Sequence, residues 1–398
     1  MAFIKPRLID FYNIPVTQEE VDFAIPLLDE DIPLCVDPFL LWKSPSLQDQ
    51  SLHTTLISTF NYFGRQYLQG EEGKAIDSII TISECQEVGL GSAENKVGKR
   101  IGQEKSKVIL SIFQTIPQIT QGGIEHIEEI QLLVDQISKD RISDFTCSIL
   151  KSFLIDYTID QCNNYKIPLS TVELVSVFSY KQREFVSEKV TLPINPQNGM
   201  PILFVPKRWL RYLQWINYDD YFKHSYINSE QKQDRVNVLN FNRQHYDVVQ
   251  TYVKQKEKTF EDCKNDPLFK PIPVISATRK LKEILKLPTG KIGNADIKYE
   301  DLIGQLMASL LYPHLDFADE QSRTDSGVLI RDLIFYNNRS YDFLADINKD
   351  FETRQIVMEI KNVREIESEN INQLNRYLND QFGRFGIIIT RNSLPRHI

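Results

Sequence analysis

The last hundred residues alternate short apolar runs with amphipathic stretches, and this pattern predicts strands that alternate with helices. In the clearest run, Ile356, Met358 and Ile360 occupy every second position. Because successive side chains of a strand point to opposite faces, these three are expected to share one buried face. Glu359 and Lys361 then share the other face. The pattern therefore predicts a strand that holds a carboxylate and an ammonium group side by side near its end.

The same pattern predicts further elements around this strand. In chain order they are a helix at residues 299–311, a strand at 328–335, a polar loop, the strand just described, a helix at 368–380 and a strand at 385–390. Apolar stripes mark the buried faces of the two helices, formed by Leu302, Leu306 and Leu310 in the first and by Ile371, Leu374 and Leu378 in the second. Asp332 interrupts an otherwise apolar strand, which is costly unless the carboxylate is paired or binds a metal. Glu300 lies in the first turn of the first helix. Gln373 and Tyr377 are four residues apart, on one face of the second helix.

The first 275 residues show mostly helical periodicity. Apolar residues at three-to-four spacing predict helices over residues 46–69, 123–165 and 242–262, while shorter runs between 170 and 206 favour strands. The capping-box spacing of Thr17 and Glu20 predicts that a helix begins there. The proline-rich stretch 267–273 predicts a linker. We therefore expect a mainly helical α+β region over residues 1–275 and an α/β domain over residues 276–398, with a mixed central sheet flanked by helices. The motifs of the first region carry no recognisable chemistry, and recognition, sensing and self-association all remain open for it.

Composition and charge narrow the class of protein. The 398 residues carry a formal net charge of −8, which argues against a protein that coats nucleic acid through bulk positive charge. No apolar run is long enough to cross a bilayer, and the first residues lack the layout of a signal peptide. The five cysteines are scattered without a C-x-x-C pair, so neither a disulfide framework nor a zinc site is expected, and a reducing, cytoplasmic setting is favoured. The basic segment from Arg279 to Lys291 is either a solvated helix face or a strip of phosphate contacts.

The order of these elements and acids resembles that of the PD-(D/E)XK nuclease superfamily, which has the restriction-endonuclease-like fold. The resemblance covers about the last quarter of the chain. In that family, the residues that match Asp332 and Glu359 bind Mg²⁺, and the residue that matches Lys361 helps to orient or activate the attacking water. Glu300 matches the first-helix acid of many members. Gln373 and Tyr377 match the Q-x-x-x-Y helix of the RecB-like branch.

The sequence departs from the family pattern at one position. Arg331, rather than proline, precedes Asp332. This leaves Asp342 or Asp346 as a competing first metal ligand, and Asp332 is preferred because it lies in the clearer strand.

The resemblance implies a metal-dependent endonuclease that hydrolyses phosphodiester bonds. It implies Mg²⁺ as cofactor, with Mn²⁺ able to substitute, and nucleic acid as substrate, DNA being favoured over RNA. A role in bacterial restriction or phage defence, and association with itself or with partner proteins, are further implications. The alternative is a non-catalytic nucleic-acid-binding or scaffold protein of a larger complex that uses a nuclease-like fold.

Overall fold

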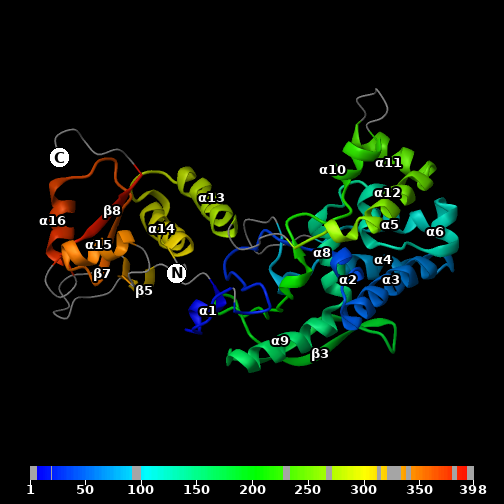
Figure 1. Ribbon diagram of the computed structural model, residues 1–398, viewed down its shortest axis with the longest axis horizontal. Coiled ribbons are helices and arrows are strands. Elements are labelled where there is room, and N and C mark those ends of the chain that lie inside the picture. The colour runs from blue at the N-terminus through cyan, green and yellow to red at the C-terminus, as the bar shows by residue number, and fades with distance from the viewer. Residues whose placement is uncertain are drawn as a thin grey trace. The chain divides into compact units, whose positions relative to one another are not determined.

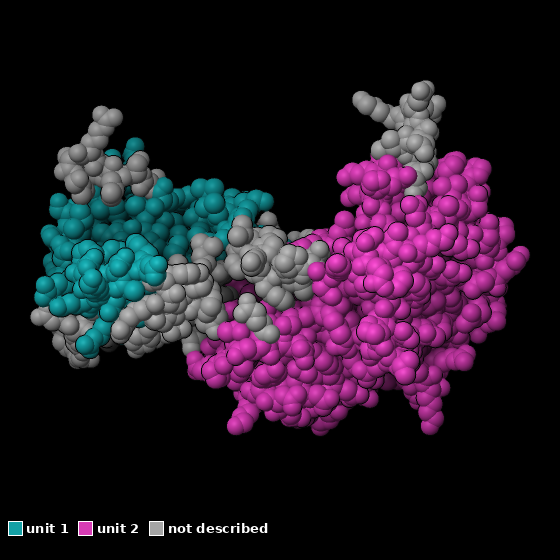
Figure 2. Space-filling model, viewed as in Figure 1, with its two compact units in different colours: residues 1–6, 270–398 teal, residues 7–269 magenta. Residues whose placement is uncertain are grey.

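The computed structural model describes residues 7–18, 20–91, 100–226, 234–265, 271–311, 315–320, 333–337, 342–378 and 383–391. The chain forms two compact units (Figure 2): Arg7–Phe269, here called the N-terminal unit, and a C-terminal unit whose described residues begin at Pro271. Both units combine helices with small sheets, so the protein is of mixed α/β class. None of the described helices is both long and apolar enough to cross a lipid bilayer.

The N-terminal unit is mainly helical (Figure 1). Its α-helices are α1 (Leu8–Phe11), α2 (Pro38–Trp42), α3 (Leu47–Leu68), α4 (Glu72–Ile82), α5 (Gln103–Thr115), α6 (Pro117–Gly122), α7 (Ile130–Leu133), α8 (Lys139–Ile149), α9 (Lys151–Tyr165), α10 (Tyr218–Tyr221), α11 (Arg235–Gln244) and α12 (Tyr246–Lys258). Short 3₁₀ or π turns are η1 (Gln86–Val88), η2 (Ile127–Glu129), η3 (Lys207–Trp209), η4 (Phe222–Tyr226) and η5 (Phe260–Asp262). The helix predicted over 46–69 is confirmed as α3. The stretch 123–165 is divided among several helices instead of forming one. Gln136 has a φ of 61°, a left-handed conformation that no α-helix accommodates, and it separates α7 from α8.

The strands of this unit form two small antiparallel pairs. β2 (Ser170–Ser179) pairs with β3 (Glu184–Leu192) in a hairpin, with a register shift between Leu174 and Val177. β1 (Cys35–Val36) pairs with β4 (Leu210–Arg211). The predicted preference for strands between 170 and 206 is thus confirmed for residues 170–192.

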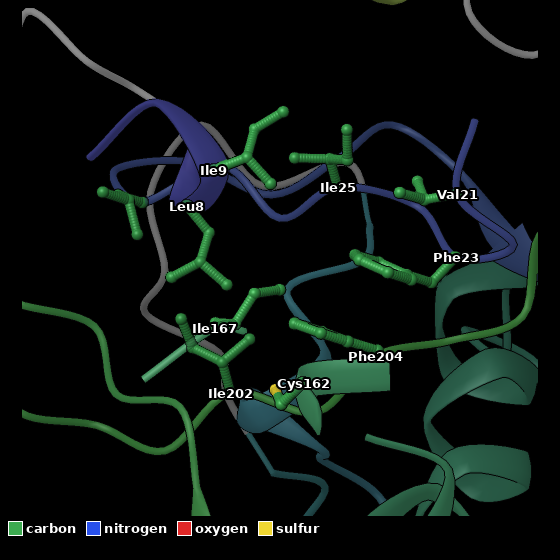
Figure 3. Close-up of a cluster of buried hydrophobic side chains, with 10 residues drawn as sticks. Leu8, Ile9, Val21, Phe23, Ile25, Cys162, Ile167, Ile202 and Phe204 are labelled. Carbon is green, nitrogen blue, oxygen red and sulfur yellow. The ribbon is translucent and has the colours of Figure 1, made fainter. Parts of the chain in front are cut away.

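No helix follows Thr17 in the described residues 17–18 and 20–34, contrary to the prediction. The expected capping contact does form, because the Thr17 N–H donates to the Glu20 carboxylate at 2.6 Å. The chain nevertheless continues without a helix, and Val21 and Phe23, two residues apart, both enter one buried cluster (Figure 3). The Phe23 ring stacks on that of Phe204, with 4.2 Å between ring centroids. Packing of Val21 and Phe23 against distant residues therefore overrides the local helix signal.

The C-terminal unit contains a four-stranded sheet in the order β5–β6–β7–β8. The strands are β5 (Leu315–Glu320), β6 (Leu333–Asn337), β7 (Gln355–Lys361) and β8 (Gly386–Thr390). β6 pairs antiparallel with both β5 and β7, and β8 runs parallel to β7. Parallel neighbours need a crossover connection, which α16 (Ser368–Tyr377) supplies. The other helical elements described here are α13 (Pro271–Lys286), η6 (Ile292–Asn294), α14 (Ala295–Leu311) and α15 (Asp342–Phe351).

Two connections differ from the predictions. The linker prediction is wrong for residues 271–273, which form the first turn of α13, and the predicted boundary at residue 275 falls inside this helix. Proline is tolerated in a first helical turn because the N–H groups there have no partner within the helix. The polar loop predicted before the Glu359 strand contains α15, whose Leu344 and Ile347 are buried three residues apart on one face. Residues 267–270 and 328–332 lie outside the described residues.

Strand β7 has a helix layer on each face (Figure 1). Ile356, Met358 and Ile360 pack in one apolar cluster with Tyr299 and Ile303 of α14, which confirms the predicted buried face. On the opposite face, Val357 packs against Leu374 and Tyr377 of α16. Glu359 and Lys361 belong to this second face, because side chains two apart in a strand point the same way.

Candidate active site

Glu359 and Lys361 lie together on the α16 face of β7. The Glu359 side chain is fully buried, and the Lys361 side chain is 19% exposed. The Lys361 Nζ atom contacts the Glu359 Oε1 atom. Burying an ionised carboxylate is costly unless an opposite charge or hydrogen bonds compensate for it, and the lysine provides such a charge. The sequence prediction that β7 holds a carboxylate and an ammonium group side by side is therefore confirmed.

Helix α16, which carries Gln373 and Tyr377, covers the same face. Tyr377 is 2% exposed and packs with Val357, and the Gln373 Nε2 atom donates a hydrogen bond to the Tyr377 hydroxyl at 3.1 Å. Gln373 itself is half-buried. The hydrogen bond holds the amide in one orientation and leaves its carbonyl oxygen available as an acceptor.

The end of β7 is tied to the turn between α13 and α14. The Asn362 Nδ2 atom donates to the carbonyls of Pro288 at 3.1 Å and Gly290 at 3.0 Å, and the Gly290 N–H donates to the Asn362 carbonyl at 2.9 Å. Gly290 has a φ of 87°, a conformation that glycine adopts without steric cost. These bonds hold the strand end at which Lys361 lies.

The remaining acids predicted for the site are placed differently. Glu300 is half-buried on α14, the helix that covers the other face of β7. Asp342 and Asp346 are exposed on α15, so they belong to a helix and not to a strand of the sheet. Asp332 and Arg331 lie outside the described residues. Asp332 is the chain neighbour of Leu333, the first residue of β6.

The donor chemistry of this face fits an oxygen-binding cation such as Mg²⁺. Glu359 brings a carboxylate into an enclosed position, and Mg²⁺ keeps several waters, so one or two carboxylates suffice to hold it. Among the described residues, no three His, Cys, Asp or Glu side chains converge in a geometry that could hold a metal ion. The second carboxylate that the sequence predicts for this site, Asp332, lies outside the described residues.

A second group of ionisable side chains, which the sequence analysis did not single out, is enclosed in the N-terminal unit. Each of its members is at most 7% exposed, and they are Asp37, His53, His126, Glu128 and Glu129. Neither carboxylate oxygen of Glu128 has a hydrogen-bond partner among the residues that the structure describes. The signal in the sequence is the run His126-Ile127-Glu128-Glu129, which places three ionisable groups within four positions of an apolar segment.

Burial alters the protonation of this group. It raises the pKa of Glu128 to about 8, an effect that the His126 charge opposes and the Asp37 charge reinforces. Burial also raises the pKa of Glu129. For His126, burial disfavours the charged form, but a hydrogen bond to Glu257 at 2.9 Å and the neighbouring carboxylates raise its pKa above the ordinary value. Because these side chains are enclosed, we assign them to pH-dependent stability and not to catalysis.

Comparison with known proteins gives three findings. A stretch of 66 residues is 37% identical to an 80.3 kDa protein of Escherichia coli (strain K12) whose name assigns it to transposon gamma-delta. The match covers 17% of this chain and 10% of that relative, so the chain spans only a small part of the relative's length. No solved structure matches the chain. A family model described as Domain of unknown function (DUF8370) matches residues 13–217, which is more than half of the chain and lies within the N-terminal unit. The protein therefore belongs to the DUF8370 family.

Proposed function

We propose that the C-terminal unit is a metal-dependent nuclease that hydrolyses phosphodiester bonds, with DNA as the favoured substrate. The observation that carries this proposal is the buried Glu359 carboxylate in contact with Lys361 on one face of a strand inside a mixed sheet. The Gln373–Tyr377 hydrogen bond lies on the helix that covers this face. The Glu359 carboxylate, the Lys361 ammonium group and the Gln373 amide are thus held by two adjacent elements, β7 and α16.

The topology supports the proposal. The element order α14, β5, β6, α15, β7, α16, β8, with β8 parallel to β7, agrees with the mixed sheet flanked by helices that the resemblance to the nuclease superfamily implies. Leu333 of β6 pairs with Met358 of β7. Asp332 and Glu359 are the chain neighbours of this pair. The transposon assignment in the name of the E. coli relative agrees with DNA as the substrate.

Each residue has a distinct part in the proposed reaction. Asp332 and Glu359 would hold Mg²⁺, which supplies positive charge at the phosphate when it is bound. Lys361 keeps a second positive charge beside that position, where it stabilises the negative charge that develops in the transition state. The Gln373 carbonyl oxygen accepts a hydrogen bond and so orients an attacking water. Tyr377 fixes the Gln373 amide through the bond between them.

Cleavage assays with matched carboxylate variants test the proposal. The purified chain is incubated with supercoiled plasmid, linear duplex, single-stranded DNA and RNA, in the presence of Mg²⁺, Mn²⁺ or EDTA. We expect metal-dependent cleavage, abolished by EDTA and lowered roughly a hundredfold or more in Glu359→Gln and Asp332→Asn. The control is Asp350→Asn, which makes the same chemical change at an exposed carboxylate of α15 and should cleave like the wild type.

Two results would contradict the nuclease. Wild-type cleavage by Glu359→Gln, in a preparation free of contaminating nuclease, would remove Glu359 from the site. Binding of nucleic acid by the wild type without cleavage of any of these substrates in either metal would favour the non-catalytic binding or scaffold function.

A further inference from the structure

A pocket of about 510 Å³ opens between α3, α9 and the β2–β3 hairpin of the N-terminal unit. Its polar lining includes Tyr62 and Arg65 from α3, Asp156 from α9, and Tyr180 and Arg183 from the turn of the hairpin. The volume lies within the range of roughly 300–1,000 Å³ that is usual for small-ligand sites. The pocket belongs to the segment that the family model matches.

The two arginines give the pocket a positive side. Both are exposed, and neither forms an ion pair with a carboxylate of the described residues. The Arg183 guanidinium lies over the Tyr62 ring, with 5.2 Å between its Cζ atom and the ring centroid. A planar guanidinium binds phosphate through two parallel hydrogen bonds. Two such groups on one concave surface therefore favour a phosphate-bearing ligand.

The hairpin turn holds Arg183 in a defined position. Its φ is 57°, a left-handed conformation that few residues other than glycine and asparagine adopt. Its N–H donates to the Ser179 carbonyl at 2.7 Å, which closes the turn. An arginine whose backbone is fixed in this way loses less conformational freedom when it binds a ligand.

Aromatic rings lie next to the arginines. The Tyr180 hydroxyl donates to the Ile149 carbonyl at 2.6 Å, and its ring packs edge-on against that of Phe178, with 5.3 Å between centroids. These contacts orient the Tyr180 ring, which is still partly exposed to the pocket. Nucleobases stack on aromatic rings and on guanidinium planes. The lining therefore offers stacking surfaces beside the phosphate-binding groups.

The remaining polar groups distinguish a nucleotide from a simple anion. Asp156 is an exposed carboxylate in the lining, and the Ser152 hydroxyl lies on the same helix. A carboxylate repels a bare phosphate, but it accepts hydrogen bonds from sugar hydroxyls and from the amino groups of bases. A ligand with a phosphate at one end and a sugar and base at the other complements both halves of the pocket.

We propose that this pocket binds a nucleoside phosphate, either as a free nucleotide or as one unit of a single strand. The inference goes beyond the nuclease proposal and does not rest on it, because all of the lining residues belong to the N-terminal unit. It assigns a ligand class to the domain that defines the family.

Binding measurements in EDTA test the inference without any cleavage. The probes are AMP, by calorimetry, and a fluorescein-labelled single-stranded oligodeoxyadenylate, by anisotropy. Arg65→Gln and Arg183→Gln should each weaken binding of the recognised probe about tenfold or more, since each removes charge-assisted hydrogen bonds. The matched control is Lys181→Gln, which removes a charge from the same turn at an exposed residue outside the lining, and it should change binding by no more than about twofold. Recognition of AMP identifies a free nucleotide, and recognition of the oligonucleotide alone identifies a single strand.

Three results would overturn the inference. The first is failure of both probes to bind the wild-type chain. The second is unchanged binding in both arginine variants, with circular dichroism showing that they are folded. The third is binding of inorganic phosphate and an abasic strand as tight as that of AMP and the oligodeoxyadenylate, which would leave the base unrecognised. None of these results bears on the cleavage assays at Glu359.

Discussion

At the scale of single residues, Lys361 is expected to affect both the stability of the fold and the rate of cleavage. Comparing Lys361→Ala with Lys361→Arg separates these two effects. Lys361 compensates the buried Glu359 carboxylate that it contacts, and in the proposed reaction it stabilises charge at the phosphate. Lys361→Ala should lower the free energy of unfolding by about 1–3 kcal/mol, because it removes a cation from a buried carboxylate. It should also lower kcat roughly a hundredfold or more, with a smaller change in KM.

Lys361→Arg serves as the control for this substitution. It keeps the positive charge, and therefore the stability, but it changes the shape of the group near the reacting atoms, so turnover should still fall. Denaturant titration and steady-state cleavage of both variants provide the readouts. Cleavage at the wild-type rate by Lys361→Ala would reduce Lys361 to a charge at the end of a strand.

The raised pKa of Glu128 predicts that the stability of the fold depends on pH. The ordinary pKa of Glu128 is 4.5, and in the fold its pKa is about 8, so the folded chain keeps a proton that the unfolded chain releases. This contribution to stability is complete below about pH 4 and is lost as the pH rises towards 8, at up to about 1.4 kcal/mol per pH unit. The raised pKa of His126 acts in the same direction, because its stabilising charge is lost as the pH rises.

Glu128→Gln should flatten this dependence, because glutamine has no proton to release. The readout is the slope of the unfolding free energy between pH 5 and pH 8, since burial of the amide shifts stability equally at every pH. Glu125→Gln, the same change at an exposed neighbour, should leave the slope unaltered. A slope in Glu128→Gln equal to that of the wild type would mean that Glu128 is ionised in the folded protein.

At the scale of elements, the candidate site depends on how closely α16 docks on the sheet. Gly386 of β8 pairs with Val357 of β7 and lies under the helix. A Cβ atom on Gly386 would lie 2.9 Å from a Leu374 methyl and 3.1 Å from a Leu378 methyl. The absence of a side chain at this position therefore lets Tyr377 and its bonded Gln373 lie close to the Glu359 face of β7.

Gly386→Ala should destabilise the docking of α16 by about 1–3 kcal/mol through overpacking. Hydrogen exchange followed by mass spectrometry should show faster exchange in α16 and β8, together with slower cleavage. The control is Gly73→Ala in α4, where a Cβ atom would meet nothing within 4 Å and where alanine should stabilise the helix. Unchanged exchange of α16 in Gly386→Ala would mean that the helix docks by other contacts.

At the scale of the whole molecule, two compact units carry the two proposed sites. The carboxylate and lysine belong to the C-terminal unit, and the arginine-lined pocket belongs to the N-terminal unit. Glu359→Gln should therefore abolish cleavage and leave the affinity of the pocket for its probe unchanged within about twofold, because sites that belong to separate units and share no residues act independently. The same titration in EDTA measures this affinity. A larger change would show that nucleic acid contacts both sites at once.

The sequence by itself determined the elements whose signal is local. The alternation of Ile356, Met358 and Ile360 predicted β7 and its buried face, and it placed Glu359 beside Lys361, because the period of a strand is a property of the backbone. The helices α3 and α16 were likewise evident from apolar residues at helical spacing. These features need only neighbours in the chain.

The tertiary structure alone decided the features that depend on distant residues. Val21 and Phe23 do not form the helix that the local capping contact predicts, because both side chains pack in a core formed by remote segments. The pocket brings together residues from α3, α9 and the β2–β3 hairpin, and the enclosed group around Glu128 joins the N-cap residue of α2, a residue of α3, and residues of η2 and its N-cap. No local period records which remote side chains meet, because that depends on how the elements pack and on which surfaces they bury together.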